Sequence, residues 1–492
     1  MRNSYIKRLL PLSALTFLAG CAVVGPDYSA PALPLLQFPA SFDQASTGLS
    51  PEAVEVQWWQ TFADPMLTGL VQQALSANHD IAIAAMRLEE AKALLRENRQ
   101  GYLPSGGSIL RYENNRRSQT ETPFDQPRRI ESYRTAVDAA WEIDLFGRVQ
   151  RSVEAARAHA GSREALLRQV QAGVAATVAA TWFELRGIET ELVLVADIRH
   201  NQQQSLRLVE RMVMAGSASE FDRLRAEALL RNVEVAVPEL EQRRSVAINA
   251  LALLVGEAPQ TFTVPTIKPV AKTLAIRTIA VGDPTGLLSR RADIAAAERN
   301  LAAATARIGV ETAGLYPEIQ VQGSIGFVAG GLDSLTGAST LSGIFGPSIR
   351  WSFLDIGRVR ARIAASEAQS KAALFIYDQT ILRALQETDN AFKAYITAGE
   401  TLGLRLLEAT ANTAAADLAR MRFTAGEGVY LDVLEAERSD FASRRALTIA
   451  RTNQQLAVVS IYKALGGGWE VCTQQQNDCS GANAAANFNF LK

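Results

Sequence analysis

The most reactive side chains in this 492-residue chain are three cysteines, two of which lie near the C-terminus. Cys472 and Cys479 are separated by six residues in a tail rich in glutamine and asparagine. In an oxidising compartment they can form a disulfide that closes a small loop, with free thiols as the alternative. A zinc site needs more ligands, and the only histidines are His79, His159 and His200. The spacing therefore favours a disulfide and predicts no metal centre.

The third cysteine, Cys21, follows a segment typical of bacterial export signals. Basic residues precede an apolar stretch at 9–20, which is too short to span a bilayer as a helix. The stretch ends in Leu-Ala-Gly-Cys and resembles a lipobox, whose cysteine becomes the mature N-terminus and carries covalent lipid. An ordinary cleavage site is the alternative. Ala22 in place of Asp favours sorting to the outer membrane, where several acyl chains give stable anchoring.

Composition and motifs argue against most other functions. The net charge is −1 and no basic tract follows the signal segment, so nucleic acid is not an expected partner. No nucleotide-binding loop, metal-ligand spacing or nucleophile motif is present, so we expect no enzyme and no cofactor beyond the lipid on Cys21. No apolar run reaches 18 residues, so any crossing of a membrane must be made by strands.

The second half of the chain repeats the first. Trp141 and the Gly-Arg-Val that begins at Gly147 return 210 residues later, at Trp351 and Gly357. Upstream the offset is 213, since Asp80-Ile81-Ala82 returns as Asp293-Ile294-Ala295. A period this long indicates one large supersecondary unit used twice.

Proline placement and apolar periodicity divide the chain into segments. Residues 149–214 and 358–423 lack prolines and predict unusually long helices, each followed by a shorter one at 221–254 or 431–464. Leu185, Ile188, Leu192 and Val195 keep the three-four-three spacing of packed helices. The predicted organisation is a signal peptide at 1–20, a lipid-anchored Pro-rich arm at 21–60, repeat 1 at 61–256, a linker or equatorial segment at 257–284, repeat 2 at 285–469 and a polar tail at 470–492.

Two segments in each repeat read as strands, at about 105–115 and 132–143 and at about 318–328 and 343–353. Their lengths are near the roughly 9–11 residues that a tilted transmembrane strand needs, with soluble hairpins as the alternative. Four strands cannot close a membrane barrel, which needs about eight, and open edges are not tolerated in lipid. Several chains must therefore pool their strands if these cross a membrane. Three chains would give twelve strands, although the sequence does not fix that number.

These features together resemble the TolC-like outer-membrane factor family, in particular the lipoprotein branch that serves resistance-nodulation-division efflux systems. The resemblance covers nearly all of the mature chain. Its matching segments are Cys-Ala-Val-Val-Gly-Pro-Asp-Tyr at 21–28, Trp58-Trp59 with Phe62-Ala63-Asp64-Pro65, both Gly-Arg-Val segments, Ala425-Gly426 before Leu431-Asp432-Val433-Leu434, and Ala-Leu-Gly-Gly-Gly-Trp at 464–469. The resemblance implies a mainly α-helical homotrimer, with a twelve-stranded outer-membrane β-barrel on a long periplasmic α-helical barrel.

The resemblance also implies a gate where the helix-to-helix turns, here 214–222 and 424–432, coil inward. The acidic constriction of the family corresponds to Asp432 and Glu435, and a ring of such carboxylates would attract cations. The alternative for Asp432 is a favourable charge in a first helical turn. Asp222 is either a capping-box partner of Ser219 or a contact between chains.

Other family positions complete the expected site. The aromatic residue of the gate corresponds to Phe423, whereas the position of its arginine is Gly428, so the usual gate hydrogen bonds are not expected here. Ala215-Gly216 and Ala425-Gly426 correspond to the turns that contact the adaptor.

The implied function is a passive exit duct for drugs, toxic organics or metal ions. Its partners would be a periplasmic adaptor, an inner-membrane pump and outer-membrane lipid. The alternatives are the exit duct of a type I protein-secretion system and a periplasmic coiled-coil scaffold lipoprotein. The sequence does not identify the cargo, which the pump selects.

Overall fold

The computed structural model describes residues 23–31, 49–50, 57–125, 127–264, 279–280 and 290–466. The signal segment, the polar tail and the cysteines at positions 21, 472 and 479 lie outside the described residues. The chain divides into two compact units, which are considered separately. Unit 1 contains Met1–Pro34, Arg87–Glu164 and Ala296–Asp378, and unit 2 contains Leu35–Met86, Ala165–Ala295 and Gln379–Lys492.

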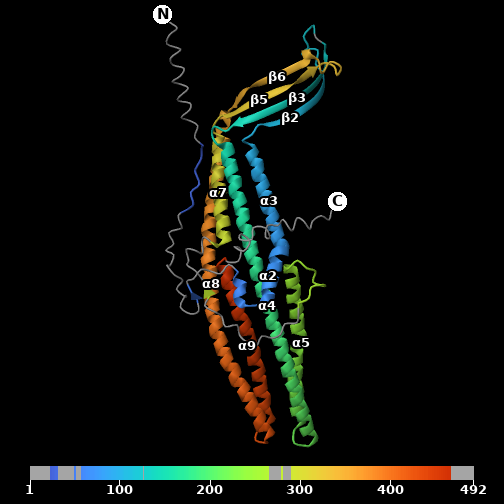
Figure 1. The fold of residues 1–492 in the computed structure, drawn as a ribbon, viewed down its shortest axis with the longest axis vertical. Coiled ribbons are helices and arrows are strands. Elements are labelled where there is room, and N and C mark those ends of the chain that lie inside the picture. Colours follow the sequence, from blue (N-terminus) through green and yellow to red (C-terminus); the bar gives the residue numbers. More distant parts are fainter. Residues whose placement is uncertain are drawn as a thin grey trace. The chain divides into compact units, whose positions relative to one another are not determined.

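The helices occur as three pairs related by the duplication, labelled in Figure 1. They are α3 (His79–Gln100) with α7 (Ala292–Ala313), α4 (Arg148–Met214) with α8 (Ile356–Thr424), and α5 (Glu220–Leu254) with α9 (Tyr430–Ala464). The predicted ends of the last two pairs lie within two residues of these bounds. Leu185, Ile188 and Val195 are buried, as their spacing predicts. Short elements complete the set: η1 (Trp58–Phe62), α2 (Pro65–Ala77), η2 (Ala338–Thr340), η3 (Phe353–Asp355) and the paired two-residue strands β1 (Leu49–Ser50) and β4 (Ile279–Ala280).

Unit 1 holds an antiparallel sheet of four strands in the order β2-β3-β5-β6. The strands are β2 (Ser105–Arg116), β3 (Arg129–Ile143), β5 (Glu318–Ala329) and β6 (Leu341–Arg350). The prediction that the last strand reaches residue 353 is wrong. The chain leaves the sheet at Trp351, whose indole N–H donates to the Leu315 carbonyl (3.1 Å), and then enters η3.

Strand register gives the sheet two different faces. Residues paired across strands share a face, so Val137 lies on the same side as Ile325, and Trp141 on the same side as Val321 and Pro347. This face also carries Phe327, Leu341, Phe345 and Ile349. The opposite face carries Arg111, Glu113, Arg134, Asp138, Glu142, Gln320, Gln322 and Ser348. One face is therefore mainly apolar and the other mainly polar, with Val328 and Ile344 among the apolar exceptions on the polar face. In sequence this pattern is clear only in parts of the strands.

The duplication extends to individual hydrogen bonds in unit 1. The Trp141 indole donates to the carbonyl of Tyr102 at 3.1 Å, which is the repeat-1 counterpart of the Trp351 bond to Leu315. Both indole rings are about half exposed. Each repeat therefore fixes the same end of its second strand with the same indole hydrogen bond.

Unit 2 shows a second repeated bond, although the residue types differ. Asn78 at the start of α3 donates through its side chain to the carbonyl of Leu254 at 2.9 Å. Arg291 occupies the corresponding position before α7 and donates to the carbonyl of Ala464, also at 2.9 Å. In both repeats, the last carbonyl of the shorter helix (α5 or α9) thus accepts a hydrogen bond from a side chain at the start of α3 or α7.

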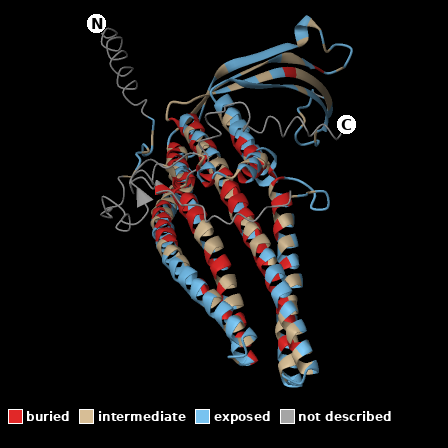
Figure 2. Ribbon diagram, turned by 60° about the horizontal axis from the view of Figure 1, so that its bottom comes forward, coloured by how far each residue is buried: buried red, intermediate tan, exposed pale blue. Residues whose placement is uncertain are grey.

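The core of unit 2 explains the paired tryptophans of the sequence. Trp58 stacks on Tyr462 at a centroid distance of 5.1 Å, and Phe62 packs on Phe183 at 4.6 Å. Asp64 caps α2 by accepting from two backbone amides, and its other oxygen accepts from Trp182 and Arg186. Buried residues concentrate along the inner faces of these helices (Figure 2). Among the described residues, no helix is long and apolar enough to cross a membrane.

Candidate functional site

Two helix-to-helix turns lie at the same end of unit 2 (Figure 1). The α4–α5 turn follows Met214 and the α8–α9 turn follows Thr424. In each turn the glycine amide donates to the carbonyl three residues earlier, and the next amide donates to the carbonyl five residues earlier, at 2.8 to 3.0 Å. This is the Schellman motif, and it needs a left-handed residue. Gly216 and Gly426 provide it with φ of 72° and 81°.

The two turns differ in how the following helix begins. In the α4–α5 turn, Ser219 and Asp222 form a reciprocal capping box, with side-chain-to-backbone distances of 3.1 and 3.2 Å. Of the two roles predicted for Asp222, the structure thus shows the capping-box partner of Ser219. The α8–α9 turn has Val429 at the equivalent position, which supplies no side-chain cap. The acidic residues that follow in α9 are therefore not held in a capping box.

Asp432 and Glu435 are exposed and lie three residues apart, so they share one face of the first turns of α9. Neither side chain has a hydrogen bond or ion pair within the described residues. The repeat-1 counterparts are Asp222, which is bound in its cap, and Arg225, which lies over the Phe221 ring at 4.1 Å. The described chain therefore has an unpaired carboxylate pair at only one of the two turns.

An apolar cluster joins the helices next to the turns. Its buried members come from α4, α5 and α9, namely Val209, Ala226, Tyr430, Val433 and Leu434. Phe423, the predicted gate aromatic, packs against this cluster and lies 5.3 Å from the Tyr430 ring. In this structure, Phe423 thus helps to hold the α8–α9 turn against α4 and α5.

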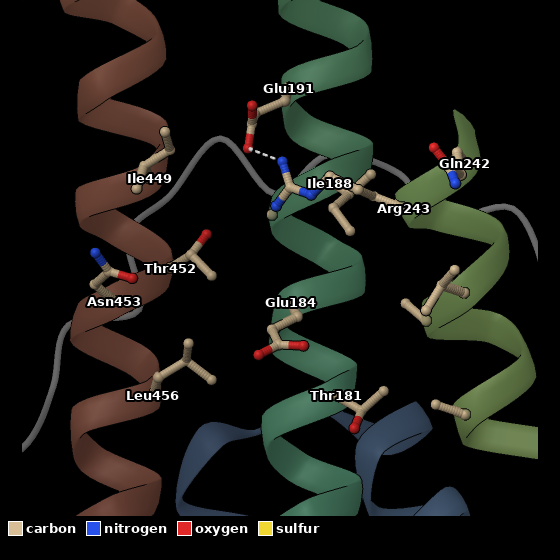
Figure 3. A pocket seen from close by; sticks show the side chains of 14 residues that line it. Thr181, Glu184, Ile188, Glu191, Gln242, Arg243, Ile449, Thr452, Asn453 and Leu456 are labelled. Carbon is tan, nitrogen blue, oxygen red and sulfur yellow. Dashed lines mark ion pairs between the residues drawn. The ribbon is translucent and has the colours of Figure 1, made fainter. Parts of the chain in front are cut away.

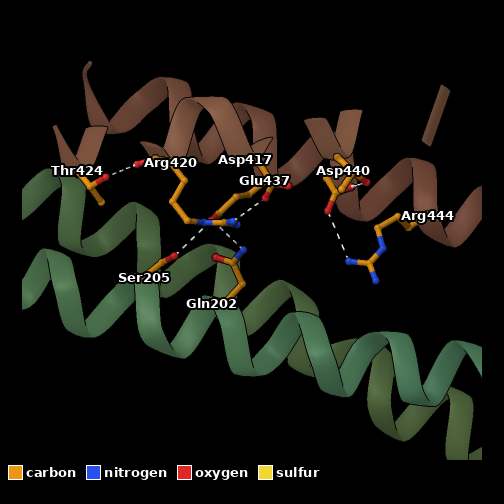
Figure 4. A network of polar contacts seen from close by, with 9 residues as sticks. Gln202, Ser205, Asp417, Arg420, Thr424, Glu437, Asp440 and Arg444 are labelled. Carbon is orange, nitrogen blue, oxygen red and sulfur yellow. Dashed lines mark hydrogen bonds and ion pairs between the residues drawn. The ribbon is translucent and has the colours of Figure 1, made fainter. Parts of the chain in front are cut away.

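A buried carboxylate, that of Glu437 on α9, accepts hydrogen bonds from side chains of α4 and α8 (Figure 4). It accepts from Gln202 at 2.9 Å and Ser205 at 3.3 Å, both on α4, and from Arg420 on α8 at 2.9 Å. Arg420 also pairs with Asp417 at 3.0 Å. We name Glu437, Gln202, Ser205 and Arg420 the Glu437 cluster. Because it links repeat 1 to repeat 2, it couples the positions of the two turns.

Local electrostatics reflect these contacts. The Ser219 hydroxyl and backbone N–H lower the pKa of Asp222. Burial raises the pKa of Tyr430, helped by the negative charges of Glu437 and Asp222. Both the Tyr430 hydroxyl and the Gln202 side-chain oxygen are buried without a hydrogen-bond partner among the described residues. Such atoms cost about 1–3 kcal/mol each, so the packing at this end of unit 2 is not fully satisfied.

A groove of about 560 Å³ lies further along unit 2, between α4, α5 and α9 (Figure 3). Its buried carboxylate, Glu191, is matched by Arg243 at 3.8 Å and Arg445 at 3.2 Å. Gly187 allows close packing here, because a Cβ would lie 2.4 Å from the Thr452 hydroxyl. The described residues contain no group of three or more His, Cys, Asp or Glu that could hold a metal ion.

The structure brings most predicted site residues together at the turns of unit 2. Ala215, Gly216, Ala425 and Gly426 are all exposed. Their roles in gating and adaptor contact stay predictions, as do those of Asp432, Glu435, Phe423 and Asp222. The Glu437 cluster is not predicted from the sequence. Its only sequence signal is that Ala436-Glu437 repeats Ala226-Glu227, whereas its partners Gln202 and Arg420 correspond to Asn412 and Glu210.

Comparison with known proteins agrees with this architecture. A sequence model of the outer membrane efflux protein family matches residues 70–257 and 284–467. The solvent efflux pump outer membrane protein SrpC of Pseudomonas putida is 32% identical over 471 residues, covering 94% of this chain and 98% of SrpC. The cation efflux system protein CusC of Escherichia coli K12 is 28% identical over 469 residues, covering 94% and 99%.

Solved structures give the same result. The structure of the outer-membrane channel OprN matches with a TM-score of 0.84 and 36% sequence identity, covering 91% of this chain and all of that one. The relatives and the structural neighbour are thus matched over almost their full lengths. The chain belongs to the outer membrane efflux protein family.

Proposed function

We propose that three copies of this chain form the exit duct of a three-part efflux pump, with a periplasmic adaptor and an inner-membrane pump of the resistance-nodulation-division class. Family membership establishes an outer-membrane efflux protein, which transports solutes and catalyses no reaction. The number of copies, the partners and the roles of individual residues are what we add.

The sheet of unit 1 supports assembly from several copies. Its outer strands, β2 and β6, each pair on one side only within the described chain. Joining β6 of one copy to β2 of the next would satisfy both edges, and three copies would close twelve strands into a barrel. The apolar face would then contact lipid, and the polar face with Arg134, Asp138 and Gln322 would line the interior. A lipid on Cys21 would add a second membrane attachment.

The observation that carries the gate proposal is the difference between the two turns. Asp432 and Glu435 are exposed and unpaired, whereas Asp222 is engaged in its cap. Three copies would place six such carboxylates around one axis, which concentrates cations and repels anions. The unsatisfied polar atoms of Tyr430 and Gln202 support a packing that can rearrange when the gate opens.

The exposed Schellman turns are the proposed contact for the adaptor. Ala215, Gly216, Ala425 and Gly426 present backbone and small side chains, which allow another protein to approach closely. Named relatives export solvents and cations, so we propose small toxic molecules as the cargo. A duct of this kind need not recognise its cargo, because the pump selects it.

Membrane fractionation combined with gel migration tests the proposal. We expect the full chain to co-purify with the outer membrane and to migrate as a trimer that heating converts to monomer. A monomer released without detergent would contradict the duct and favour the scaffold lipoprotein.

A deletion assay separates the remaining alternative. Loss of the gene should increase sensitivity to solvents, drugs or metal ions and leave protein export unchanged. Loss of a secreted protein with unchanged sensitivity would instead indicate a type I secretion duct.

A further inference from the structure

The short described segment before the first helices, Val23 to Tyr28, lies against α4 and α7 within unit 1. The Val24 amide donates to the Phe146 carbonyl at 3.1 Å, at the junction between β3 and α4. Chain geometry limits the separation of residues 21 and 23 to roughly 7 Å between Cα atoms. The predicted lipid-bearing residue, Cys21, is three residues before this contact in sequence.

A single buried guanidinium, that of Arg151 on α4, holds the segment. It donates to the carbonyls of Val24 at 3.2 Å and Gly25 at 3.3 Å, and to the Asp27 carboxylate at 2.7 Å. The Arg151 side chain is only 4% exposed, whereas Asp27 is 93% exposed. The buried guanidinium thus binds two backbone carbonyls of this segment. It also donates to the Glu154 carboxylate at 2.8 Å, which compensates its positive charge.

Steric fit adds to the hydrogen bonds. Gly25 has a φ of 87°, and a Cβ at this position would lie 2.4 Å from the Cα of Gly309 on α7. A Cβ on Gly309 would lie 2.7 Å from the Arg151 side chain. Side chains at either position would therefore push the segment off the helices.

Tyr28 forms the other end of the contact. Its hydroxyl donates to Glu298 on α7, and its ring packs on a small cluster of alanines. Those alanines are Ala158, Ala302 and Ala303. Burial and the hydrogen bond to Glu298 raise the pKa of Tyr28.

The duplication shows that this site is built in one repeat only. With the offsets of 210 and 213, Arg151 corresponds to Ala361, and Gly309 corresponds to Arg96. The alanines under Tyr28 at 302 and 303 correspond to Glu89 and Glu90. General helix packing would be served equally in both repeats. Most residues that contact the N-terminal segment are among those that differ between the repeats, whereas Ala158 corresponds to another alanine, Ala368.

We propose that Val23 to Tyr28 form a strap bound in cis to α4 and α7, and that Arg151 is the positioning residue that fixes the lipid-bearing N-terminus at the junction of β3 and α4. Because the strap is bound to the helices, it holds the lipid-bearing N-terminus at a fixed place on them, which a free tether would not do. The part that concerns lipid rests on the proposed acylation of Cys21.

Hydrogen–deuterium exchange on the full chain in detergent tests the strap. Arg151→Ala should speed exchange of the Val24 amide at least about tenfold, because several charge-assisted bonds are lost together. Arg151→Lys should give an intermediate rate, since an ammonium lacks the planar fork. Arg157→Ala, an exposed arginine on the same helix, is the matched control and should change nothing. Equal exchange in Arg151→Ala and the unmodified chain would overturn the proposal.

Two further measurements separate the strap from the lipid. Tyr28→Ala changes only the segment and should also release it from the helices. This variant keeps the proposal testable if Arg151→Ala does not fold. With acylation intact by mass spectrometry, either strap variant should lower recovery of outer-membrane trimer severalfold, and unchanged recovery would overturn the positioning role. Cys21→Ser should leave the exchange protection intact. An unacylated N-terminus in the unmodified chain would refute the lipid proposal, while exchange would still decide the strap.

Discussion

Glu437 shows how one side chain can couple the two halves of this chain. It is only 5% exposed, and its carboxylate is satisfied by donors from α4 and α8. Burying such a charge is tolerated only when it is fully hydrogen-bonded. The hydrogen bonds of the Glu437 cluster therefore stabilise one relative position of the two turns.

Removing this carboxylate should loosen that position. Glu437→Ala leaves the Gln202 side chain buried without its acceptor, which costs about 1–3 kcal/mol in unfolding free energy. Glu227→Ala is the matched control, because Glu227 occupies the corresponding place in repeat 1 and pairs with partly exposed arginines. Urea unfolding followed by circular dichroism measures both variants. Equal losses would show that the Glu437 cluster has no special role.

The cap at Asp222 should depend on pH. Hydrogen bonds from Ser219 lower the folded pKa of Asp222 below its ordinary value of 3.8. The stabilisation is therefore complete above the unfolded pKa and is lost as pH falls through the folded pKa. Ser219→Ala should speed amide exchange in the first turn of α5 at pH 7, and the difference should shrink towards pH 3. A difference that stays constant with pH would contradict the capping role.

At the residue scale, the sequence alone predicted only interactions between residues that are close together in the chain. Gly216 and Gly426 could be predicted as turn residues because a Schellman motif needs a left-handed residue within a few positions. The Glu437 cluster could not, since Gln202 is 235 residues away from Glu437. Arg151 gave no signal for the same reason: its acceptors in the N-terminal segment lie more than 120 residues earlier.

At the scale of elements, apolar periodicity and breakers placed the helices and strands closely. The long helices end at glycine turns, and the strands lie between Pro, Gly and polar loops. Two strand ends differ from the prediction by three residues, the start of β3 at Arg129 and the end of β6 at Arg350. The end of β6 depends on the Trp351 bond to Leu315, which lies 36 residues away. The two faces of the sheet emerged only from strand register, because small residues interrupt the alternation in β2 and β6.

The faces of the sheet predict opposite effects for the same substitution. Ile325 lies on the apolar face and Gln322 on the polar face of β5. Ile325→Arg should greatly reduce the trimer recovered from outer membranes, because arginine on a lipid-facing strand costs about 2–4 kcal/mol near mid-membrane. Gln322→Arg should assemble normally. Equal recovery of the two variants would argue against the proposed orientation.

At the scale of the whole molecule, duplication and its exceptions matter equally. Matching bonds from Trp141 and Trp351, and from Asn78 and Arg291, give both repeats a common frame. Two of the exceptions lie at the strap and at the second turn. We infer that three copies provide six similar units whose specific functions come from the positions where the repeats differ.

Ion selectivity of the reconstituted protein tests this account most directly. Reversal potentials are measured across a salt gradient in planar bilayers, for the unmodified chain and for the double variant Asp432→Asn with Glu435→Gln. Glu400→Gln is the control, because this exposed glutamate lies on α8 roughly 36 Å from the turn. We predict a cation-selective duct whose preference falls clearly in the double variant and not in the control. Cation selectivity that is the same in all three proteins would contradict a constriction formed by these carboxylates.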